Sequence, residues 1–204
     1  MNKAILIAGC EGNVGKAAVA KFKANGWQVA GIDIKEKSTS DVDKYISVDI
    51  KDTEAVIAAA DEIDAVMPID AVFNAAGYVL DKAYEDTTVD EWQELLTTIL
   101  GGAGNLCKAV APKMVKRHEG KIILLSCDYA KQSDVAVVDA VAANTLHGFG
   151  KSFGVEMAPE NVRVNVMYAN TPLDIESVTE TVFYLADKDT YTSAQVVAVT
   201  GEVF

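Results

Sequence analysis

Short apolar runs rich in Ile, Val and Leu alternate along this chain with longer segments of helical periodicity. Gly, Asp, Asn or Pro bounds each run, as is common for strands. The alternation is typical of a parallel sheet with helices on both faces. We therefore predict seven strands, at Ala4–Ala8, Gln28–Ile34, Lys44–Val48, Ala71–Ala75, Lys121–Ser126, Val162–Tyr168 and Gln195–Val199.

Helical segments separate these strands, and some begin at recognisable capping residues. Thr88 or Asp90 is a candidate N-cap, and Asp52 precedes Thr53 at the start of another helix. No repeat, low-complexity tract or linker interrupts the pattern, so we predict one domain spanning residues 1–204. The predicted helices are Val14–Asn25, Thr53–Ala65, Val89–Lys116, Ala136–Ala158 and Ile175–Ala186.

Charge and composition exclude several classes of function. The net charge is −12, and the only arginines are Arg117 and Arg163, which argues against nucleic-acid binding and anionic membranes. No stretch is long and apolar enough for a membrane span. The three cysteines lack metal-site spacing and are expected to be free thiols, and two distant histidines make a zinc site unfavourable. These features predict a cytoplasmic protein without a metal.

A glycine-rich loop follows the first predicted strand. Gly9-Cys10-Glu11-Gly12-Asn13-Val14-Gly15 has a G-x-x-G-x-x-G spacing and runs directly into a predicted helix. Gly9 permits a tight turn, Gly12 lets backbone amides approach a pyrophosphate, and Gly15 lets the helix lie close to the strand. The helix N-terminus presents unpaired amides and a positive dipole to the phosphates. This order of strand, loop and helix predicts a Rossmann-type dinucleotide-binding fold.

A carboxylate ends the second predicted strand. Asp33 lies about where a Rossmann fold holds the hydroxyls of the adenosine ribose, and it would repel a 2′-phosphate. Glu11 is expected to add to that repulsion, and no arginine lies nearby in the sequence. Lys35 and Lys37, in contrast, would favour a 2′-phosphate and therefore NADP(H). We predict that NAD(H) is preferred over NADP(H).

Motifs further along resemble those of the short-chain dehydrogenases/reductases almost from end to end. Lys108–Met114 followed by Gly120–Ile123 is highly characteristic, as are Gly154–Asn165 and the terminal stretch from Val182 to Gly201. The glycine loop is similar to that of dihydropteridine reductases. The resemblance implies an α/β Rossmann fold, with a doubly wound, seven-stranded parallel sheet, and an oxidoreductase that uses a nicotinamide cofactor.

The resemblance also implies which residues bind the cofactor. Val48-Asp49-Ile50 looks like the acidic element beside the adenine, and Asn74-Ala75-Ala76-Gly77 looks like the family's Asn-Asn-Ala-Gly element. The expected cofactor-binding residues are Gly9, Gly12, Asn13, Val14, Gly15, Asp33, Ile34, Asp49, Ile50, Asn74, Ala75, Ala76 and Gly77.

The positions implied for catalysis depart from the family. Its reaction uses a tyrosine acid/base and a lysine four residues later, which lowers the tyrosine pKa. Counting back from Glu156-Met157-Ala158-Pro159 places these two positions at Asp139 and Ala143, or with a one-residue slip at Ala140 and Asn144. Neither register contains the tyrosine and the lysine.

The family's remaining catalytic groups are an asparagine and a serine. The asparagine position falls on Ile99, and the serine position falls on Ser126 or, one residue on, Cys127. Tyr129 is a candidate replacement proton donor in the following loop, and Asp139 is a candidate base if burial raises its pKa. The candidate catalytic residues are Ser126, Tyr129 and Asp139.

Three functions follow from this pattern. The first is a non-catalytic NAD(H)-binding protein, a pseudoenzyme or a subunit that pairs with an active homologue. The second is a divergent NAD(H)-dependent carbonyl or alcohol oxidoreductase, and the third is an NAD(H)-sensing regulator. The resemblance implies homodimers or tetramers through helices near Leu95–Val110 and Ala136–Val155. Small residues there, including Gly101, Gly102 and Gly104, predict close packing within the chain or against a second subunit.

The segment after the sixth predicted strand is short. Helical sequence resumes by about Glu176, so the long lid that usually covers a substrate in this family is nearly absent. The site is therefore expected to be open, or covered by another subunit.

Overall fold

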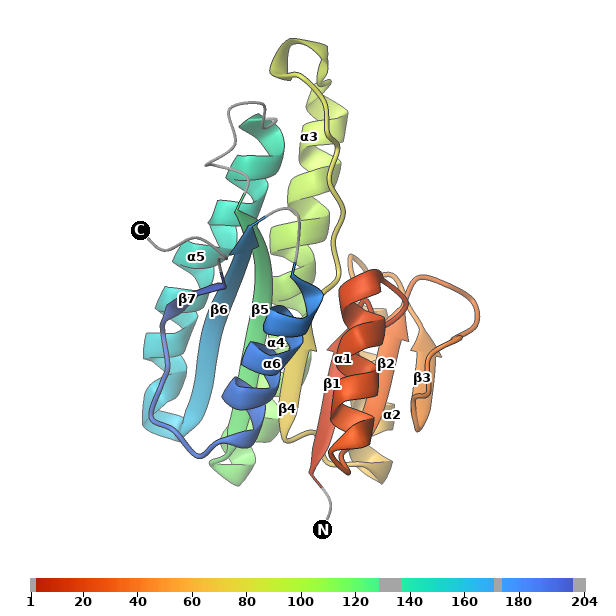
Figure 1. The fold of residues 1–204 in the computed structure, drawn as a ribbon, viewed down its shortest axis with the longest axis vertical. Helices are drawn as coiled ribbons and strands as arrows, with labels where there is room; N and C mark the ends of the chain where they lie inside the picture. The colour runs from red at the N-terminus through yellow and green to blue at the C-terminus, as the bar shows by residue number, and fades with distance from the viewer. Residues whose placement is uncertain (1–2, 129–136, 171–173, 200–204) are drawn as a thin grey trace.

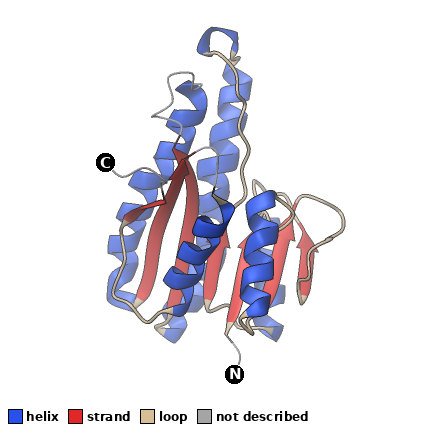
Figure 2. Ribbon diagram, in the orientation of Figure 1, coloured by secondary structure: helices blue, strands red, loops and turns tan. Residues whose placement is uncertain are grey.

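A seven-stranded parallel sheet forms the centre of the molecule (Figures 1 and 2). The computed structural model describes residues 3–128, 137–170 and 174–199. The strands follow the order β3-β2-β1-β4-β5-β6-β7, and each neighbouring pair is parallel. They are β1 (Ala4–Ala8), β2 (Gln28–Asp33), β3 (Lys44–Ser47), β4 (Ala71–Asn74), β5 (Gly120–Asp128), β6 (Val162–Asn170) and β7 (Val196–Val199).

Helices cover both faces of the sheet (Figure 1). On one face, α1 (Asn13–Ala24) and α6 (Ile175–Asp187) bury Phe22 and Val182 against the strands. On the other face lie α2 (Thr53–Val66), α4 (Gly102–Arg117) and α5 (Val137–Met157). The predicted doubly wound α/β fold is therefore confirmed.

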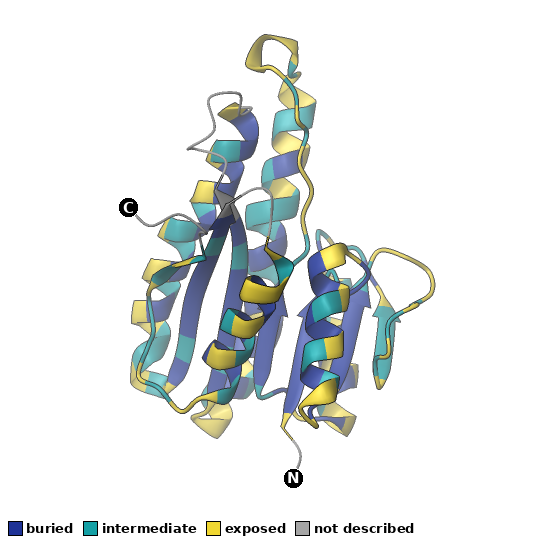
Figure 3. Cartoon of the chain, viewed as in Figure 1, coloured by how far each residue is buried: buried dark blue, intermediate teal, exposed yellow. Residues whose placement is uncertain are grey.

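The central strand β1 is apolar throughout because both of its faces are covered (Figure 3). All residues of β1 and β4 are buried, whereas the edge strand β3 is partly exposed. Two of the helices begin at predicted caps. The Asp52 side chain accepts a hydrogen bond from the Ala55 amide, and Thr88 forms a capping box with Glu91.

The segment predicted as one helix, Val89–Lys116, is two helices joined by a wider turn. Helix α3 (Val89–Leu96) passes through the π-helical turn η2 (Thr97–Gly101) into α4. Gly102 contacts the chain itself, because a Cβ there would lie 2.8 Å from Ile50 Cγ2. Gly104 has no atom within 4 Å of the position that its Cβ would take. Close packing within the chain thus accounts for Gly102 and not for Gly104.

Two short 3₁₀ helices complete the described elements, η1 (Tyr84–Asp86) and η3 (Ala158–Glu160). The described residues contain no helix that is both long enough and apolar enough to cross a bilayer.

The strand order reverses between β1 and β4. The chain leaves β1 toward β2 on one side, and it reaches β5 from β4 on the other. In open parallel sheets, ligands bind at the carboxyl ends of the strands at such a reversal. The fold therefore predicts a ligand site among the loops that follow β1, β2 and β4.

Candidate functional site

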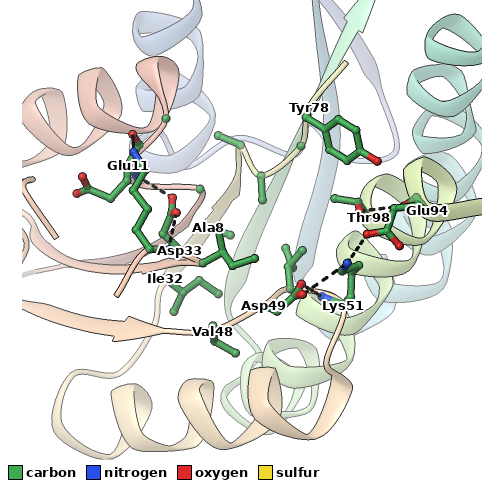
Figure 4. A pocket seen from close by; sticks show the side chains of 18 residues that line it. Ala8, Glu11, Ile32, Asp33, Val48, Asp49, Lys51, Tyr78, Glu94 and Thr98 are labelled. Atoms are coloured by element: carbon green, nitrogen blue, oxygen red, sulfur yellow. Dashed lines mark hydrogen bonds and ion pairs between the residues drawn. The ribbon is translucent and has the colours of Figure 1, made fainter. Parts of the chain in front are cut away.

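Two adjoining cavities lie at the carboxyl edge of the sheet. The first has a volume of about 390 Å³ and is lined by the ends of β1 and β2 and by the loop after β3 (Figure 4). The second has a volume of about 410 Å³ and lies between the start of α1, the end of β5 and α5. Five residues line both cavities, so the two form one elongated crevice. They are Gly12, Ala75, Ala76, Gly77 and Tyr78.

The glycine loop has no room for a side chain at Gly9 or at Gly15. Gly9 has a φ of 75°, and a Cβ there would lie 2.7 Å from the Ala76 nitrogen. A Cβ on Gly15 would lie 2.0 Å from the Gly9 carbonyl oxygen. Gly9 therefore makes the turn and Gly15 brings α1 close to β1, as predicted from the spacing.

The N-terminus of α1 opens into the crevice. Its N-cap residue is Gly12, so no side chain caps the first turn. Gly12, Asn13, Val14 and Gly15 all line the second cavity. An uncapped helix N-terminus supplies free amide donors and a positive dipole end, which fit the pyrophosphate of a dinucleotide.

Asp33 is fixed at the rim of the first cavity by two backbone groups. Its Oδ2 accepts a hydrogen bond from the Glu11 amide at 3.0 Å, and its Oδ1 accepts one from the Lys35 amide at 3.2 Å (Figure 4). Ile34 lines the same cavity and is exposed. The carboxylate oxygens keep further lone pairs, so the group can accept additional hydrogen bonds from a ligand in this cavity.

Glu11 lines the first cavity, but its carboxylate is buried and bonded to the protein. Its side chain is 1% exposed and lies beneath residues 38–40. Burial by itself would raise the pKa of Glu11. Hydrogen bonds from Thr39, Ser40 and Ser38 outweigh that effect and hold the pKa well below its usual value.

The loop after β3 forms the far wall of the first cavity. Val48, Asp49 and Ile50 line it, and Asp49 and Ile50 are among the expected cofactor-binding residues. The Asn105 side chain of α4 fixes this loop by donating to the Ile50 carbonyl at 3.0 Å and the Lys51 carbonyl at 3.1 Å. The Lys51 ammonium lies 3.6 Å from Asp49 Oδ2 and also bonds to Glu94 (Figure 4).

Asn74 has a different role from the one expected. It is buried, and its Oδ1 accepts a hydrogen bond from the Ala76 amide at 3.1 Å. It lines neither cavity, whereas Ala75, Ala76 and Gly77 line both. Asn74 therefore shapes the turn that lines the crevice.

The second cavity is mainly apolar, with Leu95, Ile99, Leu125, Ala142 and Leu146 among its lining residues. Ile99 and Ala143 lie here, at the positions expected for the family's asparagine and lysine. Ala140 and Asn144 do not line the cavity, so the register that places Asp139 and Ala143 at the catalytic positions agrees with the geometry.

Asp139 lies in the second cavity, but both of its oxygens are engaged by the protein. Oδ1 accepts a hydrogen bond from the Leu80 amide at 2.7 Å, and Oδ2 accepts one from the Asp81 amide at 2.9 Å. The residue is 5% exposed. Asp139 thus fastens the segment after β4 onto α5.

Ser126 is buried in the same cavity, and its hydroxyl donates to the Ala143 carbonyl at 2.9 Å. Tyr129 lies outside the described residues, and so does the side chain of Cys127. Of the three candidate catalytic residues, the structure brings Ser126 and Asp139 to one cavity.

Tyr78 is a residue of the crevice that the sequence did not single out. It lines both cavities, and its hydroxyl forms no hydrogen bond with any described residue. Burial, followed by the Glu94 carboxylate, raises the pKa of Tyr78 above its usual value, which keeps the phenol protonated. The position directly after the Ala75-Ala76-Gly77 turn is the signal that could have found it.

The spacing Tyr-x-x-x-Lys does occur twice, away from the expected positions on α5. One pair is Tyr78 and Lys82, in the segment between β4 and η1, where Lys82 lines neither cavity and bonds to Glu91 at 2.8 Å. The other is Tyr184 and Lys188 at the end of α6, outside both cavities. Neither pair presents both groups to the crevice.

Comparison with known proteins agrees with this geometry. The family model described as short chain dehydrogenase matches residues 3–177. "Probable galactose dehydrogenase GalD" of Rhizobium meliloti is 28% identical over 180 residues, covering 81% of this chain and 70% of the relative. The 3-oxoacyl-[acyl-carrier-protein] reductase FabG of Escherichia coli is 25% identical over 174 residues, covering 81% and 71%.

Solved structures share the fold across nearly the whole chain. ElxO with NADP bound has a TM-score of 0.90 at 18% identity, with 98% of each chain covered. NAD⁺-bound xylitol dehydrogenase has a TM-score of 0.88 at 19% identity, again with 98% of each chain covered. The fold thus occurs with either nicotinamide dinucleotide bound.

Proposed function

Because this chain belongs to the short-chain dehydrogenase/reductase family, we propose that it binds NAD(H) at the crevice without using the family's tyrosine and lysine for catalysis. The observation that supports NAD(H) binding most strongly is the placement of the Asp33 carboxylate. Its carboxylate is held between the glycine loop and the segment after β2, beside an uncapped helix N-terminus. Such a carboxylate accepts hydrogen bonds from the ribose hydroxyls and repels a 2′-phosphate.

The proposal that the family's catalytic chemistry is absent is supported by the hydrogen bonds that the polar groups of the second cavity make within the protein. The Asp139 carboxylate binds two backbone amides, and the Ser126 hydroxyl donates to the Ala143 carbonyl. A general base needs an oxygen within hydrogen-bond reach of the substrate proton. In this arrangement the groups stabilise the fold around α5 rather than holding a substrate.

A partner role agrees with the surface of α5. Val141 and Val155 are exposed on this helix, and Gly148 has no atom within 4 Å of the position that its Cβ would take. Members of the family are commonly oligomeric. A dimer or tetramer of this chain, or a pair with an active homologue, would cover this face. Light scattering of the purified protein, alone and mixed with such a homologue, distinguishes the two assemblies. Binding of NAD(H) that follows its concentration would also allow such a subunit to act as an NAD(H)-sensing regulator.

A second candidate function, an NAD(H)-dependent carbonyl or alcohol oxidoreductase, is favoured by Tyr78. Bound NADH supplies a hydride to a carbonyl carbon. The Tyr78 phenol lies at the junction of the two cavities, protonated and without a partner among the described residues. It would donate its proton to the carbonyl oxygen and regain one from water.

Calorimetric titration with NADH and NADPH tests the binding proposal. We expect NADH to bind more tightly, and Asp33→Asn to weaken NADH binding by about tenfold, because a charge-assisted hydrogen bond to ribose is lost. Asp41→Asn is the matched control, since Asp41 is exposed nearby in the segment between β2 and β3. Equal binding of NADH to both variants would contradict the proposal.

Absorbance at the nicotinamide band separates the two candidate functions. With a panel of ketones, aldehydes and sugars, the first proposal expects no oxidation of NADH above the rate without protein. Turnover that Tyr78→Phe abolishes, while NADH affinity is retained, would instead establish the second.

A further inference from the structure

The Glu11 side chain joins the glycine loop to residues 38–40. Its oxygens accept hydrogen bonds from the Ser38 hydroxyl at 2.7 Å, the Thr39 amide at 3.0 Å, the Thr39 hydroxyl at 2.7 Å and the Ser40 amide at 2.9 Å. The Ser40 hydroxyl adds a bond to the Cys10 carbonyl at 3.0 Å. We call this group, Glu11 with residues 38–40, the clasp. A buried carboxylate with several donors holds its neighbours in a single geometry.

The backbone of Glu11 belongs to the subsite expected for the adenosine ribose. Its amide donates to Asp33 Oδ2 at 3.0 Å, and its carbonyl accepts a hydrogen bond from Lys35 Nζ at 3.2 Å (Figure 4). Lys35 also donates its own amide to Asp33 Oδ1. The clasp therefore sets the spacing between the two backbone segments that hold the Asp33 carboxylate.

The clasp also engages two cations that flank this subsite. Lys16 Nζ lies 3.4 Å from Glu11 Oε2 and donates to the Thr39 hydroxyl at 2.8 Å. Lys35 Nζ is directed to the Glu11 carbonyl. Free ammonium groups at these positions would attract a 2′-phosphate through charge-assisted hydrogen bonds. While the clasp is formed, both groups are bonded to the protein.

We propose that Glu11 is a positioning residue that makes the crevice selective for an adenine dinucleotide with a free 2′-hydroxyl. The proposal rests on the NAD(H)-binding function above. Glu11 acts through Asp33, which it orients, and through Lys16 and Lys35, which it keeps from a 2′-phosphate.

Glu11→Gln tests the proposal, with Glu36→Gln as its matched control. Both changes remove one negative charge. The Glu36 side chain is exposed in the segment between β2 and β3, which also contains residues 38–40, and it makes no hydrogen bond or ion pair with the described residues. The measurement is the ratio of the dissociation constants of NADPH and NADH, by calorimetry on one preparation of each protein. NADH and NADPH differ only at the 2′ position, and any unfolded fraction of a preparation affects both titrations equally. The ratio of the two dissociation constants therefore reports only on the 2′ position.

We expect Glu11→Gln to lower this ratio by about fivefold to tenfold, through weaker NADH binding and stronger NADPH binding. Glu36→Gln should change it by less than about twofold. An unchanged ratio in Glu11→Gln, or an equal change in both variants, overturns the proposal.

Thr39→Val serves if Glu11→Gln does not fold. It keeps the carboxylate but removes the hydroxyl that bonds both Glu11 and Lys16. The ratio should fall in the same direction, by about twofold to threefold, and an unchanged ratio refutes the role of the clasp. If the unmutated protein binds neither dinucleotide, the proposed function falls and this inference falls with it. NADH binding with a ratio that is insensitive to both changes removes this inference alone.

Discussion

Replacement of Asp139 is the most informative perturbation of the second cavity. In Asp139→Ala the amides of Leu80 and Asp81 lose their carboxylate acceptors at 2.7 and 2.9 Å. Hydrogen bonds to a charged group contribute about 1.5–3 kcal/mol each when buried. Asp81 is exposed and Leu80 is only half-buried, so water recovers part of this. We therefore expect a loss of about 2–3 kcal/mol in the free energy of unfolding.

Two measurements check this value. In a chain of this length, each kcal/mol shifts the melting temperature by about 2–4 °C, so Asp139→Ala should melt about 4–12 °C lower. Hydrogen exchange at the Leu80 and Asp81 amides should become faster, because the contact that protects them is gone. Glu156→Ala is the control, since Glu156 is exposed on the same helix, and it should change the stability by less than about 0.5 kcal/mol.

Asp139→Asn refines the comparison. An asparagine retains one acceptor oxygen, but it places an NH₂ donor against a backbone donor, so we expect roughly half of the loss seen with alanine. If Asp139→Ala melted within about 1 °C of the unmodified protein, with unchanged exchange at residues 80 and 81, the structural role of this carboxylate would be refuted.

Two further perturbations have expected outcomes of known sign. Gly15→Ala places a Cβ 2.0 Å from the Gly9 carbonyl oxygen, so the free energy of unfolding should fall by about 1–3 kcal/mol and most of the NADH affinity should be lost. Gly104→Ala lies in open space within α4 and should raise the free energy of unfolding by up to about 1 kcal/mol. Thermal melts and NADH titrations check both variants, and equal effects of the two changes would contradict the packing described. The pKa of Glu11 is lower in the folded protein than in the unfolded chain, so its stabilisation is complete above the unfolded value near 4.5 and is lost as the pH falls through the folded value. The difference in melting temperature between the unmodified protein and Glu11→Gln should therefore shrink as the pH is lowered from 7 to about 3, and parallel curves over that range would show that the carboxylate is not held in its ionised form.

The sequence predicts the fold well because its signals are local. Continuous apolar runs mark strands covered on both faces, and Asp52 and Thr88 mark helix starts through bonds to residues three positions away. The glycine spacing is equally local. A Cβ on Gly15 would meet Gly9 within the same loop, whereas the space at Gly9 is closed by the distant Ala75 and Ala76. The π-helical turn within the long helical segment has no such local signal.

The site is less predictable because its decisive contacts join distant parts of the chain. Asp139 lies 59 residues from Leu80, and Glu11 lies 27–29 residues from the three residues that bury its carboxylate. From sequence alone, Glu11 was expected to add to the repulsion of a 2′-phosphate, and Asp139 was a candidate base. Only the tertiary structure reveals the donors that form hydrogen bonds with these two carboxylates. Tyr78 was missed because a residue beyond a strand end has no periodic pattern.

The most direct test of the central claim is a crystal structure of the protein grown with NADH. The account predicts the pyrophosphate over the first turn of α1 and the adenosine ribose hydroxyls within about 3.2 Å of the Asp33 carboxylate. Adenosine bound elsewhere, or a crevice left without the dinucleotide at saturating concentration, would contradict it.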